Sequence, residues 1–455
     1  MKILEGDYMS ARKIAYKVLM DIEINKNYSN ISLNSHLDKE KIDDRDRGLV
    51  TELVYGVIEN KRYIDYMINK LSKIKVRKMQ HSVKTILRMG VYQIVFLDRV
   101  ADYAAINESV NMMKKIDKKS SSFVNAILRN VSRQKEEIFK IKEDTSDNIA
   151  IKYSYEKWIV DRLIEEHGKE KTKKIIKALD EKPKLYIRIN KSKAYRHESY
   201  EDMLEFIISN LSADQIVAKK VDGFDEALEV ENFKNIEKNI MFRKGYISIQ
   251  DISSMLVAKV LNPKEGSKVL DVCAAPGGKS THIAEIMNNT GEVVSQDIYD
   301  HKIKLIDGYA KRLGLKNIRS EKSDATVLNE DYVEKFDYVL SDVPCSGIGI
   351  VRRKPEIKYK SEEDVNNLPD IQMNILKNAS SYVKSGGTLI YSTCTIFKEE
   401  NIDVIKNFLE ENKNFTLESI QNIDINKETL DEGYINIYPY ENNMDGFFIC
   451  KMKKI

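Results

Sequence analysis

The chain has 455 residues, and its 74 lysines and arginines nearly balance its 71 aspartates and glutamates. This length exceeds what one hydrophobic core supports, so we expect two or three domains. Hydrophobic residues make up 42% and charged residues 32%, which is typical of a soluble globular protein. The sequence has no apolar run as long as a transmembrane helix, and its N-terminus lacks the apolar stretch of a signal peptide, so we expect a cytoplasmic protein. Met9 is a second candidate start.

The four cysteines are far apart in the sequence, and the six histidines are scattered. Neither C-x-x-C nor H-E-x-x-H occurs, so we expect reduced thiols and no metal site. Cys273 and Cys450 are interpreted as core residues, because free cysteine is often buried. No association stripe and no membrane segment is visible, which predicts a monomer without a membrane partner.

Residues 1–138 are expected to form an all-α domain. Glycine is sparse there and the first proline is Pro183, so helix breakers are few. Apolar residues recur at helical spacing in two runs, which are Leu49, Leu53 and Val57, then Val83, Leu87, Val91 and Ile94. Residues 1–135 hold 26 Lys and Arg against 16 Asp and Glu, a net charge of +10, while the remainder carries −7. This asymmetry is typical of a domain that faces nucleic acid, although a lysine-rich solvated surface explains it equally well.

Residues 139–245 are predicted to form a helical connector followed by a small RNA-binding subdomain of the α+β (RRM or ferredoxin-like) type. The connector, residues 139–183, is charged and helical in pattern. Strands are predicted at residues 184–191 and 214–221, and a helix at 200–211.

Residues 246–455 are predicted to form an α/β domain of the Rossmann-like type. Short apolar runs alternate there with helical stretches, which indicates a parallel sheet covered by helices on both faces. Ligands of such sheets bind just beyond the carboxyl ends of the strands.

The stretch VLDVCAAPGGKSTHIAEI (269–286) predicts a strand, a glycine loop and a helix. Gly277 and Gly278 let the backbone approach a ligand, and the helix N-terminus offers free N–H groups. Neither G-x-G-x-x-G nor G-x-x-x-x-G-K-[ST] is present. Their absence disfavours a nicotinamide dehydrogenase and a P-loop nucleotide site.

Two acids follow the next two predicted strands. Asp297 is placed to accept hydrogen bonds from ribose hydroxyls, and Asp324 to hold an adenine amino group. Each acid alone is equally well explained as a strand-end cap. Together with the glycine loop they favour a nucleoside ligand without a pyrophosphate, and S-adenosylmethionine is such a ligand.

Two cysteines follow the ends of predicted strands. Cys345 lies in VLSDVPCSG (339–347) and Cys394 in GTLIYSTCT (387–395). Because parallel strands end at one edge of a sheet, we expect both thiols at that edge. A thiolate is a strong nucleophile, and two thiols there beside Asp342 favour covalent catalysis over the alternative of two core cysteines.

The catalytic motifs of the chain resemble those of RNA 5-methylcytosine methyltransferases of the Sun/RsmB type, in the same order. They are DVCAAPGGK, DVPCSGIGIVRRKPEIKY, YSTCT and DGFF. The stretches RDRGLVTELVYGVIENKRYID and RMGVYQIVFLD, followed by AINESV, resemble the NusB-like RNA-binding domain of these bacterial enzymes. The resemblance covers nearly the whole chain and points to the type that methylates cytosine 967 of 16S ribosomal RNA. Val343 stands where the family has alanine, and we expect it to leave the chemistry unchanged.

The resemblance implies a role for each residue near the strand ends. Cys394 is the nucleophile that attacks carbon 6 of cytosine, and Cys345 assists proton removal and product release. Asp342 contacts N3 and the amino group of the base. DNA cytosine methyltransferases attack from the Pro-Cys position instead, so the presence of both cysteines favours an RNA enzyme.

The resemblance also implies binding residues. Those for S-adenosylmethionine are Cys273, Ala274, Ala275, Pro276, Gly277, Gly278, Lys279, Asp297, Asp324 and Asp342. Arg352, Arg353 and Lys354 follow the Pro-Cys motif and are candidates for RNA phosphate contacts, with a solvated basic loop as the alternative.

The predicted function is methylation of carbon 5 of a specific cytosine in small-subunit ribosomal RNA. One alternative keeps this chemistry but moves it to transfer RNA or another ribosomal RNA site. Another is a non-catalytic RNA-binding assembly or antitermination factor of the same fold.

Overall fold

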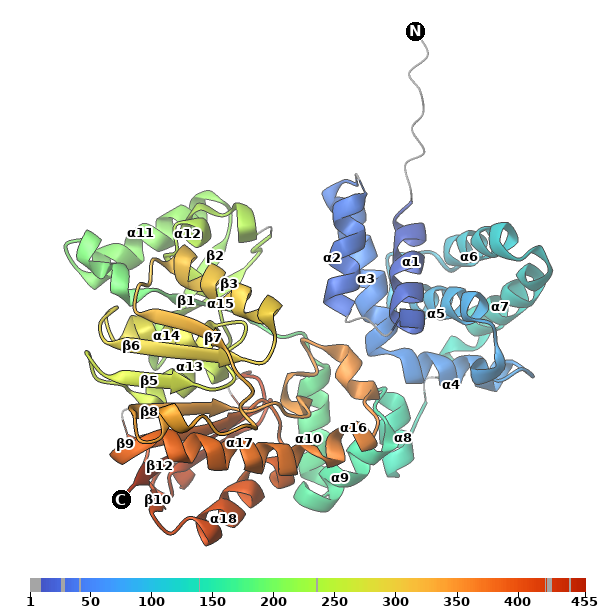
Figure 1. Ribbon diagram of the computed structural model, residues 1–455. Helices are drawn as coiled ribbons and strands as arrows, with labels where there is room; N and C mark the ends of the chain where they lie inside the picture. Colours follow the sequence, from blue (N-terminus) through green and yellow to red (C-terminus); the bar gives the residue numbers. More distant parts are fainter. Residues whose placement is uncertain are drawn as a thin grey trace. The chain divides into compact units, whose positions relative to one another are not determined.

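The structure is a computed structural model, and it describes residues 10–25, 29–40, 42–138, 140–234, 236–421, 423, 428–441 and 443–455. Met1 and Met9, the two candidate starts, lie outside these ranges. The chain divides into two compact units (Figure 1). The first unit comprises Met1–Asp180 and Arg353–Glu362, and the second comprises Glu181–Arg352 and Glu363–Ile455. Domain boundaries at residues 138 and 245 stay a prediction.

The first unit is helical, as predicted. Its helices are α1 (Ala11–Asn25), α2 (Ser29–Lys39), α3 (Asp44–Glu59), α4 (Lys61–Leu71), α5 (His81–Phe96), α6 (Asp102–Ile116), α7 (Ser121–Ile138), α8 (Ser146–Lys152), α9 (Lys157–His167) and α10 (Lys169–Asp180). Helix α5 is central, because its apolar face and much of the opposite face are buried. A Cβ on Gly90 would lie 2.7 Å from the Leu128 side chain, so this glycine lets α5 pack closely against α7.

A short segment from far along the chain belongs to the first unit. It contains the 3₁₀ helix η7 (Pro355–Tyr359) and follows the Pro-Cys motif in sequence. The Lys358 side chain is only 2% exposed, and its Nζ donates to the carbonyl oxygen of Tyr153 at 3.0 Å and to the Asp180 carboxylate at 3.0 Å. The Tyr359 hydroxyl donates to the carbonyl oxygen of Ile58 at 2.6 Å. The first unit is therefore completed by residues that the sequence order places in the catalytic part of the chain.

The second unit contains a small α+β subdomain, as predicted. Its antiparallel sheet has the order β2 (Val217–Val221), β3 (Phe224–Glu231), β1 (Leu185–Ile189) and β4 (Ile247–Ile249). Helices α11 (Tyr200–Ala213) and α12 (Ile240–Arg243) accompany it. Ile187, Leu228 and Ile207 form part of a buried core shared by the sheet and α11.

The large sheet of the second unit contains the predicted parallel strands, and antiparallel strands that the sequence pattern did not reveal extend it to a mixed sheet. Its order is β10 (Phe415–Leu417), β12 (Phe447–Lys454), β9 (Val383–Thr393), β8 (Phe336–Asp342), β5 (Lys268–Asp271), β6 (Glu292–Asp297) and β7 (Ile318–Lys322), with β11 (Tyr434–Ile437) paired to β12. Strands β5 to β9 are parallel, whereas β12 runs antiparallel to β9 and to its other two partners. The apolar run of β12 reads like any buried strand, so its direction was not visible in the sequence.

Helices cover both faces of the large sheet (Figure 1). They are α13 (Ile252–Leu261), α14 (Gly278–Ile286), α15 (Asp300–Leu313), α17 (Leu368–Tyr382) and α18 (Ile402–Glu411), and the four-residue helix α16 (Glu363–Asn366) precedes α17. Val269 belongs to the core that contains α13 and α14, and its neighbour Leu270 to the core that contains α17 and α18. Among the described residues, no helix has both the length and the apolar character needed to cross a membrane.

The strand order reverses between β5 and β8, because the chain passes through β6 and β7 on one side before it returns to β8 on the other. Open α/β sheets bind ligands outside the carboxyl ends of their strands at such a point. The glycine loop follows β5 and the Pro-Cys motif follows β8, so both predicted sites lie at the reversal.

Candidate active site

The loop between β5 and α14 has the backbone that a ligand site requires. Ala274 N–H donates to the carbonyl oxygen of Gln296 at 2.7 Å, which ties the loop to β6. Gly277 has φ 107°, a conformation that other residues rarely adopt, and a Cβ there would lie 3.3 Å from the Ile306 Cα. Helix α14 starts at Gly278, so its first N–H groups have no acceptor within the helix.

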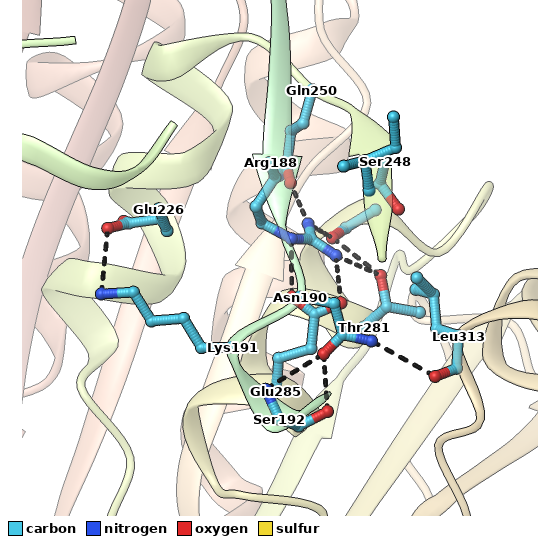
Figure 2. Close-up of polar contacts among 12 residues, drawn as sticks. Arg188, Asn190, Lys191, Ser192, Glu226, Ser248, Gln250, Thr281, Glu285 and Leu313 are labelled. Carbon is cyan, nitrogen blue, oxygen red and sulfur yellow. Dashed lines mark hydrogen bonds and ion pairs between the residues drawn. The ribbon is translucent and has the colours of Figure 1, made fainter. Parts of the chain in front are cut away.

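A buried arginine of the α+β subdomain braces the start of α14. Figure 2 shows Arg188, from β1, among Glu285, Gln250 and Thr281. Its Nε donates to Glu285 Oε2 at 2.8 Å, and its Nη1 donates to the carbonyl oxygen of Gly278 at 2.9 Å. The Arg188 and Glu285 side chains are 1% and 3% exposed. The first turn of the loop helix is thus held by a residue that the sequence analysis did not select.

Of the two predicted nucleoside-binding acids, Asp297 is the last residue of β6 and Asp324 lies two residues beyond β7. Asp297 is 6% exposed, and its carboxylate receives the Tyr299 N–H at 3.3 Å and the Lys302 ammonium at 3.3 Å. Asp324 accepts the hydroxyl of Thr326 at 2.6 Å and its N–H at 2.9 Å, and these hydrogen bonds lower the pKa of Asp324. Asp324 therefore caps its own turn, as the alternative interpretation expects, and its adenine contact stays a prediction.

The structure brings the two strand-end cysteines together. Cys394 follows β9 directly and Cys345 lies three residues beyond β8, and their Sγ atoms are 3.3 Å apart. The hydrogen bond to Cys394, burial and the nearby Glu400 charge raise the pKa of Cys345 well above that of an ordinary thiol. The raised pKa favours the protonated form of Cys345, and either sulfur can be the donor of the hydrogen bond between them.

An ion pair joins the glycine loop to the Pro-Cys strand. Lys279 Nζ lies 2.7 Å from Asp342 Oδ2, and the Ser392 hydroxyl donates to Asp342 Oδ1 at 2.7 Å. Burial alone would lower the pKa of Lys279, but the Asp342 carboxylate and the Cys394 sulfur outweigh it and raise that pKa. A cation thus lies where it stabilises negative charge on both Asp342 and Cys394.

The Arg352 side chain is buried and hydrogen-bonded within the chain, contrary to the prediction that it binds RNA phosphates. Its side chain is 1% exposed, its Nε donates to Asp445 Oδ1 at 2.8 Å, and both Nη atoms donate to Asn443 at 2.7 Å. Every guanidinium nitrogen therefore has an acceptor within the chain. Arg353 and Lys354 belong to the first unit, and their RNA contacts stay predictions.

The DGFF motif is joined to the Pro-Cys loop by backbone hydrogen bonds. Gly446 N–H donates to the carbonyl oxygen of Gly349 at 2.9 Å, and Gly349 N–H donates to the carbonyl oxygen of Cys394 at 3.0 Å. A Cβ on Gly446 would lie 2.8 Å from the Gly349 Cα, so the two backbones approach too closely for any other residue.

Other residues at the site were not selected from the sequence. Asp271 is fully buried at the end of β5, where it accepts the Ser280 hydroxyl at 2.6 Å, and burial raises its pKa to about 7. Glu400 and Asn401 contact the two cysteine loops, as described below. An acid at the end of β5 was a visible signal, whereas Glu400 and Asn401 stand in a polar stretch that resembles an exposed helix start.

A mixed α/β sheet with a glycine loop at its reversal point and two thiols at the adjoining strand ends defines a Rossmann-like methyltransferase. A family model described as "16S rRNA methyltransferase RsmB/F" matches residues 258–453, the NusB family matches residues 9–133, and a ferredoxin-like domain of RsmF/B-like methyltransferases matches residues 155–237. A Bacillus subtilis protein, "Probable ribosomal RNA small subunit methyltransferase B", is 40% identical over 98% of this chain and 99% of its own length. The chain belongs to this methyltransferase family.

Two solved structures share the fold. The crystal structure of PH0851 has a TM-score of 0.80 at 24% identity, covering 98% of this chain and 99% of that one. The structure of NSun6 from Pyrococcus horikoshii with the ligand SFG has a TM-score of 0.57 at 24% identity, covering 65% of this chain and 97% of that one. These likenesses confirm the predicted fold class, an all-α NusB-like domain, a ferredoxin-like subdomain and a Rossmann-like domain.

Proposed function

We propose that this protein transfers the methyl group of S-adenosylmethionine to carbon 5 of a cytosine in small-subunit ribosomal RNA, through a covalent bond between Cys394 and the base. The observation that carries the proposal is the 3.3 Å separation of the Cys345 and Cys394 sulfurs beside the Lys279–Asp342 pair. The family and the names of the relatives support the substrate class.

The chemistry requires two sulfurs with different tasks. Carbon 5 of cytosine is a poor nucleophile until the Cys394 thiolate adds to carbon 6 and makes the ring enamine-like. Asp342 holds the N3 and amino edge of the base, which stabilises the addition. After methyl transfer the proton on carbon 5 must leave before the Cys394 bond can break. Cys345 assists this step, in which the proton passes to solvent water, and the C–H electron pair forms the C5=C6 double bond as the C6–S bond breaks, which restores the Cys394 thiolate together with the product base.

The residues around the glycine loop fit a nucleoside with a sulfonium group. Bound S-adenosylmethionine supplies the methyl group. The loop N–H groups at the start of α14 are available to it, and Asp297 is a buried carboxylate whose own donors lie no closer than 3.3 Å. Ribose hydroxyls that replace these long contacts would form shorter ones. Lys279, paired to Asp342, keeps the loop next to the place where the base reacts.

The basic N-terminal unit is proposed to hold RNA by its phosphates, with Arg353 and Lys354 contributing. The target base must then leave its stack to reach the thiols. Phosphate contacts release counterions, so the affinity of the full chain for 16S ribosomal RNA should fall steeply with salt. Affinity that is independent of salt would contradict this part of the proposal. We further propose that the protein acts as a cytoplasmic monomer, which light scattering on the purified chain tests for the oligomeric state.

The deciding experiment separates the two cysteines. Cys394→Ala should neither methylate RNA nor form a covalent complex, because the attacking atom is gone. Cys345→Ala should attack but release slowly, so a protein–RNA adduct should survive denaturing electrophoresis and disappear in the double variant. If Cys394→Ala traps RNA and Cys345→Ala does not, the two roles are reversed.

The substrate is tested by transfer of tritium from labelled S-adenosylmethionine. We expect label in 16S ribosomal RNA and none in transfer RNA, and mass spectrometry of nuclease fragments then shows whether cytosine 967 carries it. An absence of label in every RNA, with cofactor bound, would favour the alternative of a non-catalytic assembly or antitermination factor.

A further inference from the structure

Two consecutive residues, Glu400 and Asn401, lie against both cysteine loops. Glu400 ends the 3₁₀ helix η8 (Lys398–Glu400), and Asn401 precedes α18. They are 0% and 2% exposed, although both are polar. Polar side chains are buried this completely only when hydrogen bonds hold them, so their partners show what they do.

Glu400 holds the residues on both sides of Cys345. Its Oε2 accepts the Ser346 N–H at 2.8 Å and the Gln372 Nε2 at 2.9 Å. The same Gln372 nitrogen donates to the carbonyl oxygen of Pro344 at 2.9 Å. These three hydrogen bonds fix the loop that carries Cys345 before and after the sulfur.

Asn401 holds the residues on both sides of Cys394. Its Oδ1 accepts the Thr393 hydroxyl, and its Nδ2 donates to the carbonyl oxygen of Thr395 at 3.1 Å. The hydroxyls of Thr395 and Ser346 lie 2.7 Å apart and join the two loops directly. The two residues thus hold both cysteine loops by hydrogen bonds, Glu400 the loop of Cys345 and Asn401 the loop of Cys394.

We propose that Glu400 and Asn401 are positioning residues that set the distance between the two catalytic sulfurs, Glu400 by holding the Cys345 loop and Asn401 by holding the Cys394 loop. The inference rests on the proposed two-cysteine mechanism. Both sulfurs must reach one cytosine ring, and a displacement on the order of 1 Å in such an arrangement costs about a hundredfold in rate.

The second carboxylate oxygen of Glu400 provides a conservative variant. Oε1 is buried and has no hydrogen-bond partner among the described residues. In Glu400→Gln the amide oxygen can take the position of Oε2 and accept the hydrogen bonds from Ser346 and Gln372. The amide nitrogen then takes the position of Oε1, which has no hydrogen-bond partner among the described residues. Glu400→Gln therefore keeps the hydrogen bonds that hold the Cys345 loop, and Glu400→Ala removes them.

Alanine variants of Glu400 and Asn401 should both lose activity, but they should differ in whether a covalent RNA adduct accumulates. Glu400→Ala displaces Cys345, so methyl transfer should fall on the order of a hundredfold in kcat and a covalent RNA adduct should accumulate, as for Cys345→Ala. Asn401→Ala displaces Cys394, so the same loss should occur without an adduct. KM for S-adenosylmethionine should stay unchanged in both, and Glu400→Gln should recover most of kcat. Asp403→Ala, an exposed acid on α18, is the matched control and should behave like the wild type.

A chemical measurement of the sulfur separation is independent of RNA. The oxidant diamide takes two electrons and two protons from a dithiol and leaves a disulfide. Thiols as close as Cys345 and Cys394 should be oxidised to a disulfide quickly in the wild type and Glu400→Gln, and at least tenfold more slowly in Glu400→Ala and Asn401→Ala. Calorimetry with S-adenosylmethionine and thermal melting identify variants that have not folded.

The outcomes separate the inference from the proposed function. If wild-type protein methylates no RNA but the disulfide rates differ as expected, the proposed function is wrong and the positioning role stands. If folded Glu400→Ala and Asn401→Ala proteins keep wild-type kcat or wild-type disulfide rates, the positioning role is wrong. The same holds if Glu400→Gln is as inactive as Glu400→Ala.

Discussion

The buried ion pair between Arg188 and Glu285 yields an energetic prediction. Both side chains are at most 3% exposed, and Arg188 also holds the carbonyl oxygen of Gly278 at the start of α14. Glu285→Leu leaves the guanidinium buried without a counter-charge, which costs about 3–5 kcal/mol. At about 1.4 kcal/mol for each factor of ten, the opening of this region should become about two to four orders of magnitude more favourable. The double variant Arg188→Met/Glu285→Leu buries no charge, so it should recover much of the loss.

The assay must report on the second unit. Trp158 is the only tryptophan and lies in the first unit, so tryptophan fluorescence is unsuitable. Hydrogen exchange of peptides from α14, followed by mass spectrometry, measures the opening directly. We expect faster exchange in Glu285→Leu and partial recovery in the double variant. Wild-type exchange in Glu285→Leu, or a double variant that opens more readily than the single one, would refute the reasoning.

Three further predictions concern single residues. Asp297→Ala should lower the affinity for S-adenosylmethionine about tenfold or more, because charge-assisted hydrogen bonds to the ribose are lost, and unchanged calorimetric binding in the folded variant would contradict this. Gly446→Ala places a Cβ 2.8 Å from the Gly349 Cα and should lower stability by about 1–3 kcal/mol in a denaturant titration, whereas an unchanged midpoint would show that the loops can separate freely. Burial raises the pKa of Asp271 to about 7, so the folded protein binds this proton more tightly than the unfolded chain does, and stability should fall as the pH rises from about 4 to 7. Asp271→Asn should flatten that decline in urea unfolding at pH 5 and pH 8, and an unchanged decline would assign it to another group.

Much of the fold was predictable because its signals are local. Strand β5, the glycine loop and α14 follow one another within a few residues, so apolar runs and glycines placed them correctly. The positions of Cys345 and Cys394 beyond strand ends were predicted for the same reason. The helical first unit followed from the scarcity of proline and glycine and from the apolar spacing, whose residues are buried in the structure, with Leu49 packed against the core.

The sequence by itself determined the order of the elements and the residue types at the strand ends, whereas the tertiary structure decided which of them meet. The contact between Cys345 and Cys394 depends on the register of β8 against β9, in which Asp342 faces Ser392. Arg352 is paired with Asp445, which lies 93 residues later in the chain. The sequence around Arg352 therefore could not show that this side chain is buried and already has acceptors for its hydrogen bonds. The antiparallel direction of β12 also depends on pairing between distant segments. Such pairings are selected by the burial and hydrogen bonding of the whole sheet, and a short stretch of sequence contains neither.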